Sequence, residues 1–326
     1  MAITAEQVEE KWGAKNSTKV ISQIKATETD LLDEYFLPNS EPKMGNTVTI
    51  KIEKGAGLIL ASVAPNAEHL VVDRPTVYEL NITLPRFPLE NDIDSSTLNE
   101  VNSLDEKEQP VQLAAEIGKI QKEHKLNIDT TLEYMSTGAF FGKIMDGAGN
   151  ILFDFQSALP AIEFKTGKDL IVSINEIDDA MVAELGENPG WDAKCSRAFM
   201  TKVASLAKAE NLFTDKQAEW AGEGKDRALI VHGARFEPYV KSYKDIEGNT
   251  KDFIETGFMA AIPKSKRIYK FYYGRANHTQ AATSRPSLYF STTEKLPKGR
   301  GIAVLSETKA IPVCVNPSAI IRGTQA

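Results

Sequence analysis

Residues 110–138 read PVQLAAEIGKIQKEHKLNIDTTLEYMSTG, and this stretch decides the fold. One helical face carries a stripe of apolar residues, namely Leu113, Ile117, Ile120, Leu132 and Met135. His124 and Ile128 fill the same stripe. Pro110 suits the first turn of a helix, and the lone interior Gly118 costs about 1 kcal/mol without ending it. The pattern predicts roughly 40 Å of continuous helix at ~1.5 Å per residue, ending at Gly138. Because one apolar stripe runs along so long a helix, we expect a spine with other elements laid across it.

The residues that follow the spine predict a β-hairpin. Two apolar runs, 140–145 and 151–155, flank the turn sequence Asp146-Gly-Ala-Gly-Asn150. Asp146 and Asp154 do not follow the spacing of a calcium-binding loop, so we interpret this segment as a structural turn.

The residues before the spine predict short helices and then strands. Up to about residue 43 the chain reads as an arm of short helices, with a small apolar cluster ending at Pro38: Leu31, Leu32, Tyr35 and Phe36. From Asn46 the apolar residues alternate with polar ones, which predicts a half-buried strand. A second apolar run at 58–63 and two extended pieces within 71–85 follow. Residues 45–90 are therefore expected to form a strand-rich excursion, and Asp94 to cap a helix that follows it.

The second half of the chain mixes strands and helices. Strands are predicted at 170–172 and 228–232, helices at 178–185 and 192–209, and a hairpin turn at 247–250. The C-terminal part is predicted to be mainly extended, with strands at these residues: 268–273, 288–291, 301–305 and 311–315. The fold class is therefore α+β.

Composition describes an ordinary globular protein. The chain has 326 residues, 42% hydrophobic and 25% charged, which is enough for a sizeable core. No apolar run approaches the ~18–20 residues that a membrane span needs, and the N-terminus lacks the pattern of a secretory signal. Cys195 and Cys314 lie far apart without a CxxC partner, which predicts buried thiols in a reducing compartment. We expect synthesis in the cytoplasm and no contact with membranes.

Charge is distributed unevenly along the chain. Residues 1–110 carry 10 Lys and Arg against 19 Asp and Glu, a balance of 10 − 19 = −9. Residues 260–326 carry 11 against 2, a balance of 11 − 2 = +9, while the whole chain is at −7. Complementary ends can attract copies of the chain head to tail, and such contacts propagate into rings or shells. The alternative is that the two ends meet within one subunit.

No motif in the sequence indicates catalysis. The four histidines, His69, His124, His232 and His278, have no His or Cys at ligand spacing. His124 lies on the stripe of the spine and is interpreted as a packing residue, and a catalytic role for His232 is kept as a minor alternative. We therefore predict no catalytic residue, no cofactor and no metal ion.

The most distinctive local pattern mixes basic and aromatic residues in the segment 264–275, KSKRIYKFYYGR. One interpretation is a platform that stacks nucleic-acid bases. The other is a strand that packs Tyr269, Phe271 and Tyr273 inward while Lys270 and Tyr272 face outward. We favour the strand, because an acidic chain is a poor match for phosphate.

Three stretches carry a resemblance to a known family. They are the spine running into GKIMDGAGNILFDF (142–155), the strand ending in YYGR (272–275), and the closing LPKGRGIAVLSETKAIPVCVNPSAIIR (296–322). In this order they resemble the major capsid proteins of tailed bacteriophages, and in particular the lambda-type major head protein family, phage major capsid protein E.

The resemblance implies the fold of tailed-phage and herpesvirus capsids, divided into five parts. These are an N-terminal arm (1–44), an extended loop lying over a neighbouring subunit (45–90), a peripheral domain with the spine and hairpin (91–164), an axial domain (165–300), and C-terminal return strands (301–326). Copies would form the pentamers and hexamers of an icosahedral head around double-stranded DNA.

The resemblance also implies partners and a location. Beside itself, the chain is expected to contact a scaffolding protein, a decoration protein, a portal protein and packaged DNA. Because no long coiled-coil prefix follows Met1, we expect the scaffold to be a separate polypeptide. The protein would assemble in the host cytoplasm and reside in the virion. The basic residues Lys264, Lys266, Arg267 and Lys270 are the predicted subunit interface, facing the acidic arm and loop of a neighbour.

Three alternatives remain at the level of sequence. A bacterial nanocompartment shell shares this fold but encloses enzymes. An intracellular α/β hydrolase or transferase built on residues 165–260 would need a nucleophile or phosphate-loop motif that the sequence lacks. A nucleic-acid binding module would use the basic aromatic strand.

Overall fold

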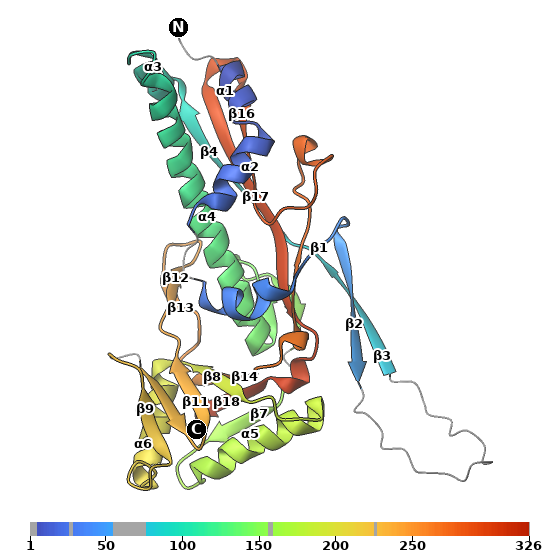
Figure 1. The fold of residues 1–326 in the computed structure, drawn as a ribbon, viewed down its shortest axis with the longest axis vertical. Coiled ribbons are helices and arrows are strands. Elements are labelled where there is room, and N and C mark those ends of the chain that lie inside the picture. The colour runs from blue at the N-terminus through green and yellow to red at the C-terminus, as the bar shows by residue number, and fades with distance from the viewer. Residues whose placement is uncertain (1–4, 26–28, 55–75, 156–158, 225–226, 326) are drawn as a thin grey trace, which may run out of the picture. The chain divides into compact units, whose positions relative to one another are not determined.

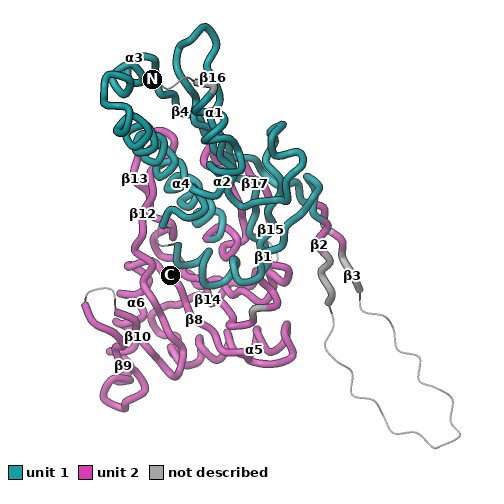
Figure 2. Tube along the Cα trace, turned by 45° about the horizontal axis from the view of Figure 1, so that its top comes forward, with its two compact units in different colours: residues 1–48, 82–136, 270–313 teal, residues 49–81, 137–269, 314–326 magenta. Residues whose placement is uncertain are grey.

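The computed structural model describes residues 5–25, 29–54, 76–155, 159–224 and 227–325 (Figure 1). The chain divides into two compact units that each draw on several stretches of sequence (Figure 2). Unit 1 comprises residues 1–48, 82–136 and 270–313, and unit 2 comprises residues 49–81, 137–269 and 314–326. Helices and strands mix in both units, which confirms the α+β class.

The spine is present as helix α4 (Gln109–Phe141), with 33 residues. Gly118 lies inside it with open space around its Cα, so the helix continues through this position. The predicted end at Gly138 is wrong by one turn. A side chain at Gly138 would stand 2.4 Å from the carbonyl oxygen of Lys143, so glycine here permits close packing of the following strand. The helix gives way only at Gly142, whose φ of 86° requires the left-handed conformation that glycine adopts freely.

Unit 1 is built around a five-stranded sheet. Its order is β1 (Ser40–Pro42), β15 (Tyr269–Tyr273), β17 (Gly301–Cys314) and β16 (Phe290–Lys295), and β4 (Arg86–Asp94) also pairs with β17. The pieces predicted at 301–305 and 311–315 are one strand of 14 residues. Its polar middle, Ser306 to Lys309, is buried between neighbouring strands, so the polar break in the sequence does not interrupt the ladder.

A compact apolar cluster holds this sheet to the helices of unit 1. Its buried members come from α1, β4, α3, α4 and β17: Val8, Ile93, Val101, Leu113, Ile117, Ile302 and Val304. Helix α3 (Ser95–Asn102) begins where predicted, since the Asp94 carboxylate accepts a hydrogen bond from the backbone N–H of Thr97 at 2.8 Å. Leu113 and Ile117 thus face the sheet, as the spine stripe predicts.

The N-terminal segment forms short helices, as predicted. They are α1 (Ala5–Lys11), α2 (Ala14–Gln23) and the π-turn η1 (Leu32–Phe36). Helices α1 and α2 pack on β16, and the hydroxyl of Thr18 both donates to the carbonyl of Ser291 and accepts from its N–H. The four apolar residues predicted to cluster before Pro38 are all buried.

Unit 2 contains a seven-stranded mixed sheet. Its order is β7 (Ala161–Phe164), β18 (Ile321–Gln325), β14 (Phe258–Pro263), β8 (Trp191–Cys195), β11 (Ala234–Pro238), β10 (Ala228–Val231) and β9 (Ala218–Ala221). Helices α5 (Leu170–Leu185) and α6 (Arg197–Ala209) pack on this sheet and on each other. A large apolar core lies between them, in which Phe164 meets Phe199 and Phe236 edge to face.

Two predictions in unit 2 are wrong. Residues 170–172 open helix α5 instead of forming a strand, because Asp169 caps the N–H groups of Ile171 and Val172. The predicted helix 192–209 is strand β8 followed by α6, which Ser196 caps through the N–H of Phe199. In both places a short polar side chain sets the helix start, and apolar content alone did not locate it.

Three hairpins that form separate two-stranded sheets complete the described part of the fold. They are β2 (Thr47–Lys54) with β3 (Thr76–Thr83), β5 (Lys143–Met145) with β6 (Ile151–Asp154), and β12 (Ser242–Lys244) with β13 (Thr250–Asp252). The hairpin turns predicted at 146–150 and 247–250 are confirmed. The predicted apolar run at 58–63 lies outside the described residues. Short 3₁₀ turns occur at Leu37–Asn39, Lys266–Ile268, Thr279–Ala281, Pro297–Gly299 and Pro317–Ala319.

Candidate assembly surfaces

The basic aromatic segment is a strand, which was the favoured interpretation. Tyr269 and Phe271 are buried, and the hydroxyl of Tyr269 donates to the carbonyl of Pro263 at 2.9 Å. Tyr272, predicted to face outward, is also buried, since Lys43 lies over its ring at 4.9 Å. Burial is the larger cause that raises the pKa of Tyr272, and the nearby negative charge of Glu41 raises it further. These rings are therefore packed into the protein and do not form an open stacking platform.

The four predicted interface residues have different surroundings. Lys264 pairs with Asp192 at 3.0 Å, and Lys270 pairs with Glu41 at 2.9 Å. Glu41 also binds Lys43, and the hydrogen bonds from both lysines lower the pKa of this carboxyl. Arg267 is exposed, while Lys266 opens a 3₁₀ turn and its side chain is not among the described parts. Two of the four cations, Lys264 and Lys270, therefore already have a carboxylate partner within the chain.

A buried polar stripe on α4 was not predicted. Four side chains at a regular spacing of four residues are at most 4% exposed: Gln121, Lys125, Asp129 and Glu133. Because this spacing keeps side chains on one helical face, the four form a polar line along the spine. The spacing is visible in the sequence, but polar residues on a helix usually face water, so no local pattern indicates that these four lie inside.

Lys125 and Asp129 form the centre of this stripe. Their charged atoms lie 3.8 Å apart, the Lys125 ammonium stands 3.5 Å from the centre of the Tyr289 ring, and the Tyr289 hydroxyl donates to Asp129 at 2.6 Å. Burial lowers the pKa of Lys125 even though Asp129 and Asp33 oppose this effect. Burial, followed by the charge of Asp129, raises the pKa of Tyr289.

Glu133 and His124 attach other segments of unit 1 to the spine. The Glu133 carboxylate accepts hydrogen bonds from the N–H groups of Leu31 and Leu32, both at 2.9 Å. The ring of His124 bonds Ser306 and Asn91, each at 2.9 Å, and its burial lowers its pKa. His124 is thus a buried network residue, as predicted. The stripe orients the N-terminal segment by specific hydrogen bonds as well as by apolar packing.

The remaining residues considered for chemistry have structural roles. His232 and Gly233 both have positive φ, at 48° and 82°, and form the tight turn between β10 and β11. Cys195 and Cys314 are buried free thiols, and burial raises the pKa of each to about 12. Among the described residues, no cluster of three or more His, Cys, Asp or Glu has the arrangement of a metal site.

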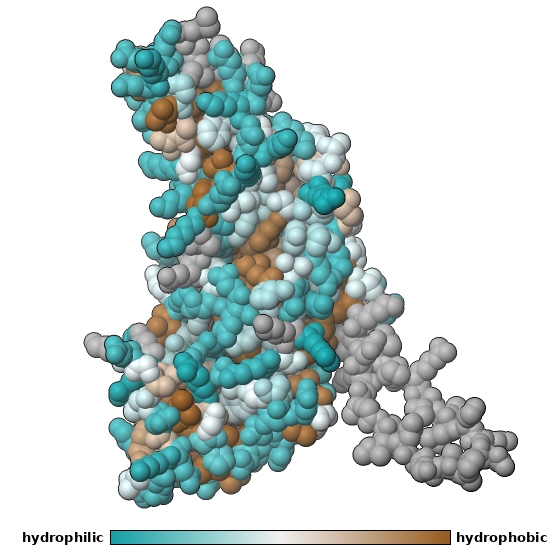
Figure 3. Space-filling model, in the orientation of Figure 1, coloured by the Kyte–Doolittle hydropathy of each residue, from teal (hydrophilic) through white to brown (hydrophobic). Residues whose placement is uncertain are grey.

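The surface carries scattered apolar side chains. On the face shown in Figure 3, they lie in small patches among hydrophilic residues. Within the described ranges, no helix combines the length and the apolar composition of a membrane span.

Comparison with solved structures identifies the fold. The chain and a protein assigned as the capsid protein of an Escherichia coli CFT073 prophage cover 100% of each other, with a TM-score of 0.62 and 13% identity. The mature capsid of bacteriophage PhiM1 gives a TM-score of 0.50 and 15% identity, over 90% of this chain and 87% of that chain. A phage-related protein from Bordetella bronchiseptica RB50 gives 0.50 and 9%, over 94% and 95%. No curated protein sequence matches the chain.

A spine helix, a β2–β3 hairpin, a β-rich unit around β17 and a seven-stranded α/β unit therefore define the fold of tailed-phage capsid proteins. The family model for phage major capsid protein E matches residues 14–325, so the chain belongs to that family. It is a major capsid protein, a structural component of the virion that self-assembles into a shell. This family membership sets aside the enzyme alternative.

Proposed function

We propose that copies of this chain form the pentamers and hexamers of an icosahedral head that encloses double-stranded DNA. The observation that carries the proposal is the family match over residues 14–325, which leaves almost no part of the chain for another activity. The net charge of −7 suits containment, because a negatively charged shell does not adhere tightly to phosphate. We place assembly in the host cytoplasm.

The proposal assigns a role to each part of the chain. Residues 1–44 are the arm, 45–90 the extended loop over a neighbour, 91–164 the peripheral domain, 165–300 the axial domain, and 301–326 the return strands. The pairing of β2 with β3 supports the loop, since these strands extend as a two-stranded ribbon. Helices α5 and α6 and five strands of the seven-stranded sheet fall within residues 165–300, which supports an axial domain with its own core. Strands β7 and β18 of the same sheet lie outside these bounds, and residues 270–300 belong to unit 1.

The proposed partners are a scaffolding protein, a decoration protein, a portal protein and the packaged DNA. Light scattering and negative-stain microscopy of the purified full-length protein test the assembly, first alone and then with candidate scaffolds from the same genome. Closed particles with five-fold and six-fold capsomers are the expected result. Particles that enclose a co-purifying enzyme would point to a nanocompartment. A protein that stays monomeric with every scaffold candidate would contradict the proposal.

The predicted interface is tested by charge reversal. Changing Lys264, Lys266 and Arg267 together to Glu should impair assembly while the monomer stays folded. Because Lys264 pairs with Asp192, Arg267→Glu alone is the cleaner variant, as it alters an exposed residue. Normal shells from both variants would exclude this segment from the interface.

A further inference from the structure

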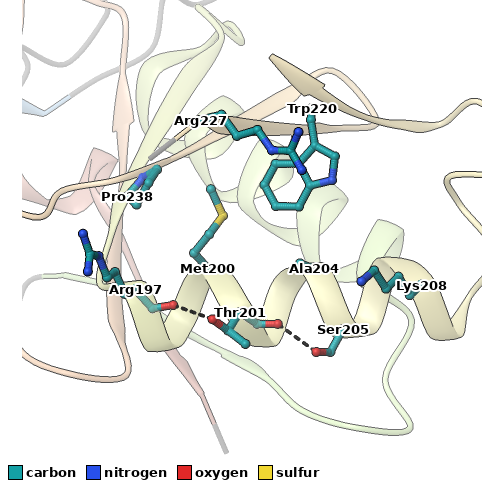
Figure 4. Close-up of a pocket in the computed structure, with 9 residues that line it drawn as sticks. All are labelled: Arg197, Met200, Thr201, Ala204, Ser205, Lys208, Trp220, Arg227 and Pro238. Atoms are coloured by element: carbon teal, nitrogen blue, oxygen red, sulfur yellow. Dashed lines mark hydrogen bonds between the residues drawn. The ribbon is translucent and has the colours of Figure 1, made fainter. Parts of the chain in front are cut away.

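A groove in unit 2 combines three cations with a tryptophan. Its floor is one face of helix α6, and its wall is the hairpin of β9 and β10 (Figure 4). The groove has a volume of about 380 Å³. The residues that line it are Arg197, Met200, Thr201, Ala204, Ser205, Lys208, Trp220, Arg227 and Pro238.

Small side chains separate the cations along the helix. Arg197 and Lys208 stand eleven positions apart on α6, about 16 Å at ~1.5 Å per residue. Between them, the hydroxyls of Thr201 and Ser205 are turned onto the carbonyls of Arg197 and Thr201, at 2.9 and 2.8 Å (Figure 4). The middle of the floor is therefore low and has few groups that compete for a ligand. An extended polypeptide of about five residues spans the same length at ~3.3 Å per residue.

The wall presents a guanidinium that is already positioned. Trp220 pairs with Leu229 across the hairpin, and Leu229 belongs to the core under α6, so the indole faces the helix. The Arg227 guanidinium lies over this ring at 4.4 Å from its centre. A stacked guanidinium keeps its edge N–H groups available for a carboxylate or phosphate. Neither Arg227 nor Lys208 forms an ion pair within the described part of the chain, and both are exposed.

The surroundings favour a polypeptide over a nucleic acid. The Trp220 ring is already stacked by Arg227 and by Phe213, whose centre lies 6.3 Å away, so a base would have to displace one of them. Met200 and Pro238 add apolar surface that can seat one aliphatic side chain. A volume of this size falls within the ~300–1,000 Å³ of pockets that take small ligands or short peptide segments.

The occupant is better sought in another protein than in a second copy. One exposed acidic loop of the described chain, residues 103–108, is turned on itself, since the N–H groups of Glu108 and Gln109 bond the carbonyl of Asp105. It is not an extended strand that would lie along α6. Charge complementarity nevertheless requires carboxylates in the groove.

We propose that the groove between α6 and the β9–β10 hairpin is a docking site for an extended acidic segment of a separate partner protein. Carboxylates of the segment would contact Arg227 and Lys208, and one aliphatic side chain would sit between Met200 and Trp220. The inference rests on the proposed function in one respect, namely that the shell protein has protein partners.

The test is direct peptide binding to the full-length protein, measured by fluorescence anisotropy. The probe is a labelled peptide Asp-Glu-Leu-Glu-Asp-Glu, and its neutral counterpart Asn-Gln-Leu-Gln-Asn-Gln is the control ligand. Lys208→Glu combined with Arg227→Glu should weaken binding about a hundredfold or more, since each of the two lost charge-assisted hydrogen bonds corresponds to about tenfold. Lys119→Glu with Lys244→Glu makes the same change in net charge on exposed residues elsewhere and should leave binding unchanged.

A second variant separates the groove from general electrostatics. Ser205→Trp fills the floor while keeping every cation, so it should abolish binding in a protein whose circular dichroism is unchanged. Binding that survives Ser205→Trp, equal binding of the neutral peptide, or displacement by a short DNA duplex would overturn the proposal. Loss of self-association in the Lys208/Arg227 variant without added partner would also overturn it, because the occupant would then be a second copy.

The assay also separates this inference from the proposed function. Peptide binding does not depend on shell formation, which microscopy of the wild-type protein follows independently. Shells without peptide binding would remove the docking site and leave the capsid function in place. Peptide binding without shells would leave the docking site in place and contradict the proposed capsid assembly.

Discussion

Two glycines on the same helix should respond oppositely to alanine. Gly118 and Gly138 both lie inside α4. A Cβ at Gly118 meets nothing within 4 Å, whereas at Gly138 it would lie 2.4 Å from the carbonyl oxygen of Lys143 and 3.2 Å from the Cα of Ile144. Real Cβ contacts stay beyond 3.0 Å, so the chain after the helix must retreat by at least 3.0 − 2.4 = 0.6 Å.

The magnitudes follow from these contacts. At Gly118, alanine restricts the unfolded chain and should stabilise the helix by about 1 kcal/mol. At Gly138 the same gain is opposed by overpacking, because the new Cβ would press on the backbone of the β5–β6 hairpin. Backbone atoms cannot move aside as the end of a flexible side chain could. Forced shifts of this kind cost about 1–3 kcal/mol and sometimes more. Because the obstacle is backbone, we take the upper part of this range, about 2–3 kcal/mol, as the cost at Gly138. After the gain of about 1 kcal/mol, Gly138→Ala should destabilise the protein by about 1–2 kcal/mol, and the two variants should differ by about 2–3 kcal/mol.

Urea unfolding of the full chain, followed by far-ultraviolet circular dichroism, measures both variants against the wild type. For domains of 150–250 residues, 1 kcal/mol corresponds to about 2–4 °C in Tm, so a thermal scan gives a second readout. Gly138→Ala with wild-type stability, or Gly118→Ala with a lower midpoint than wild type, would refute the reasoning. The first result would mean that the helix does not pack so closely on the strand after it.

Further predictions concern three buried polar residues. Burial lowers the pKa of His124 in the folded protein, so just below pH 6.5 the imidazole is protonated only in the unfolded chain, and stability should fall as the pH drops through that value. His124→Gln should flatten this dependence in urea midpoints measured from pH 7 to 5. Ser196→Ala removes a helix cap and the acceptor of the Gly257 N–H at 2.9 Å, and should cost about 1–3 kcal/mol; an unchanged midpoint would contradict this. Asp129→Ala leaves Lys125 buried without its ion-pair partner and should lower the free energy of unfolding by about 3–5 kcal/mol. The combined change of Lys125 to Met and Asp129 to Leu should cost less, and a double-mutant cycle measures the difference.

Local signals in the sequence were enough for the spine and the turns. The spacing of Leu113, Ile117 and Ile128 predicts α4, since a helical period is visible in the chain itself. The hairpin turn at 146–150 is predicted equally well, because Asp146 accepts hydrogen bonds from the N–H groups of Ala148 and Asn150 within the turn. The order of these segments also carried the family resemblance, which the match over residues 14–325 confirms.

Signals that depend on distant partners misled the prediction or were missed. The apolar run 170–172 looks like a strand until Asp169 and the core under α5 turn it into a helix. The ion pairs of Lys264 with Asp192 and of Lys270 with Glu41 were likewise not visible in the sequence, and the subunit interface at these lysines stays a prediction.

Local patterns were enough to predict the spine helix and the hairpin turns, because each depends on residues close together in the chain, and the order of the motifs along the chain indicated the family. Which polar groups are buried and which cations have a carboxylate partner depended on the tertiary structure. The stripe ending at Glu133 is buried because the N-terminal segment supplies N–H donors from about 100 residues away. The groove on α6 exists because a hairpin brings Trp220 and Arg227 over a helix face. Burial and pairing depend on partners that no local pattern specifies.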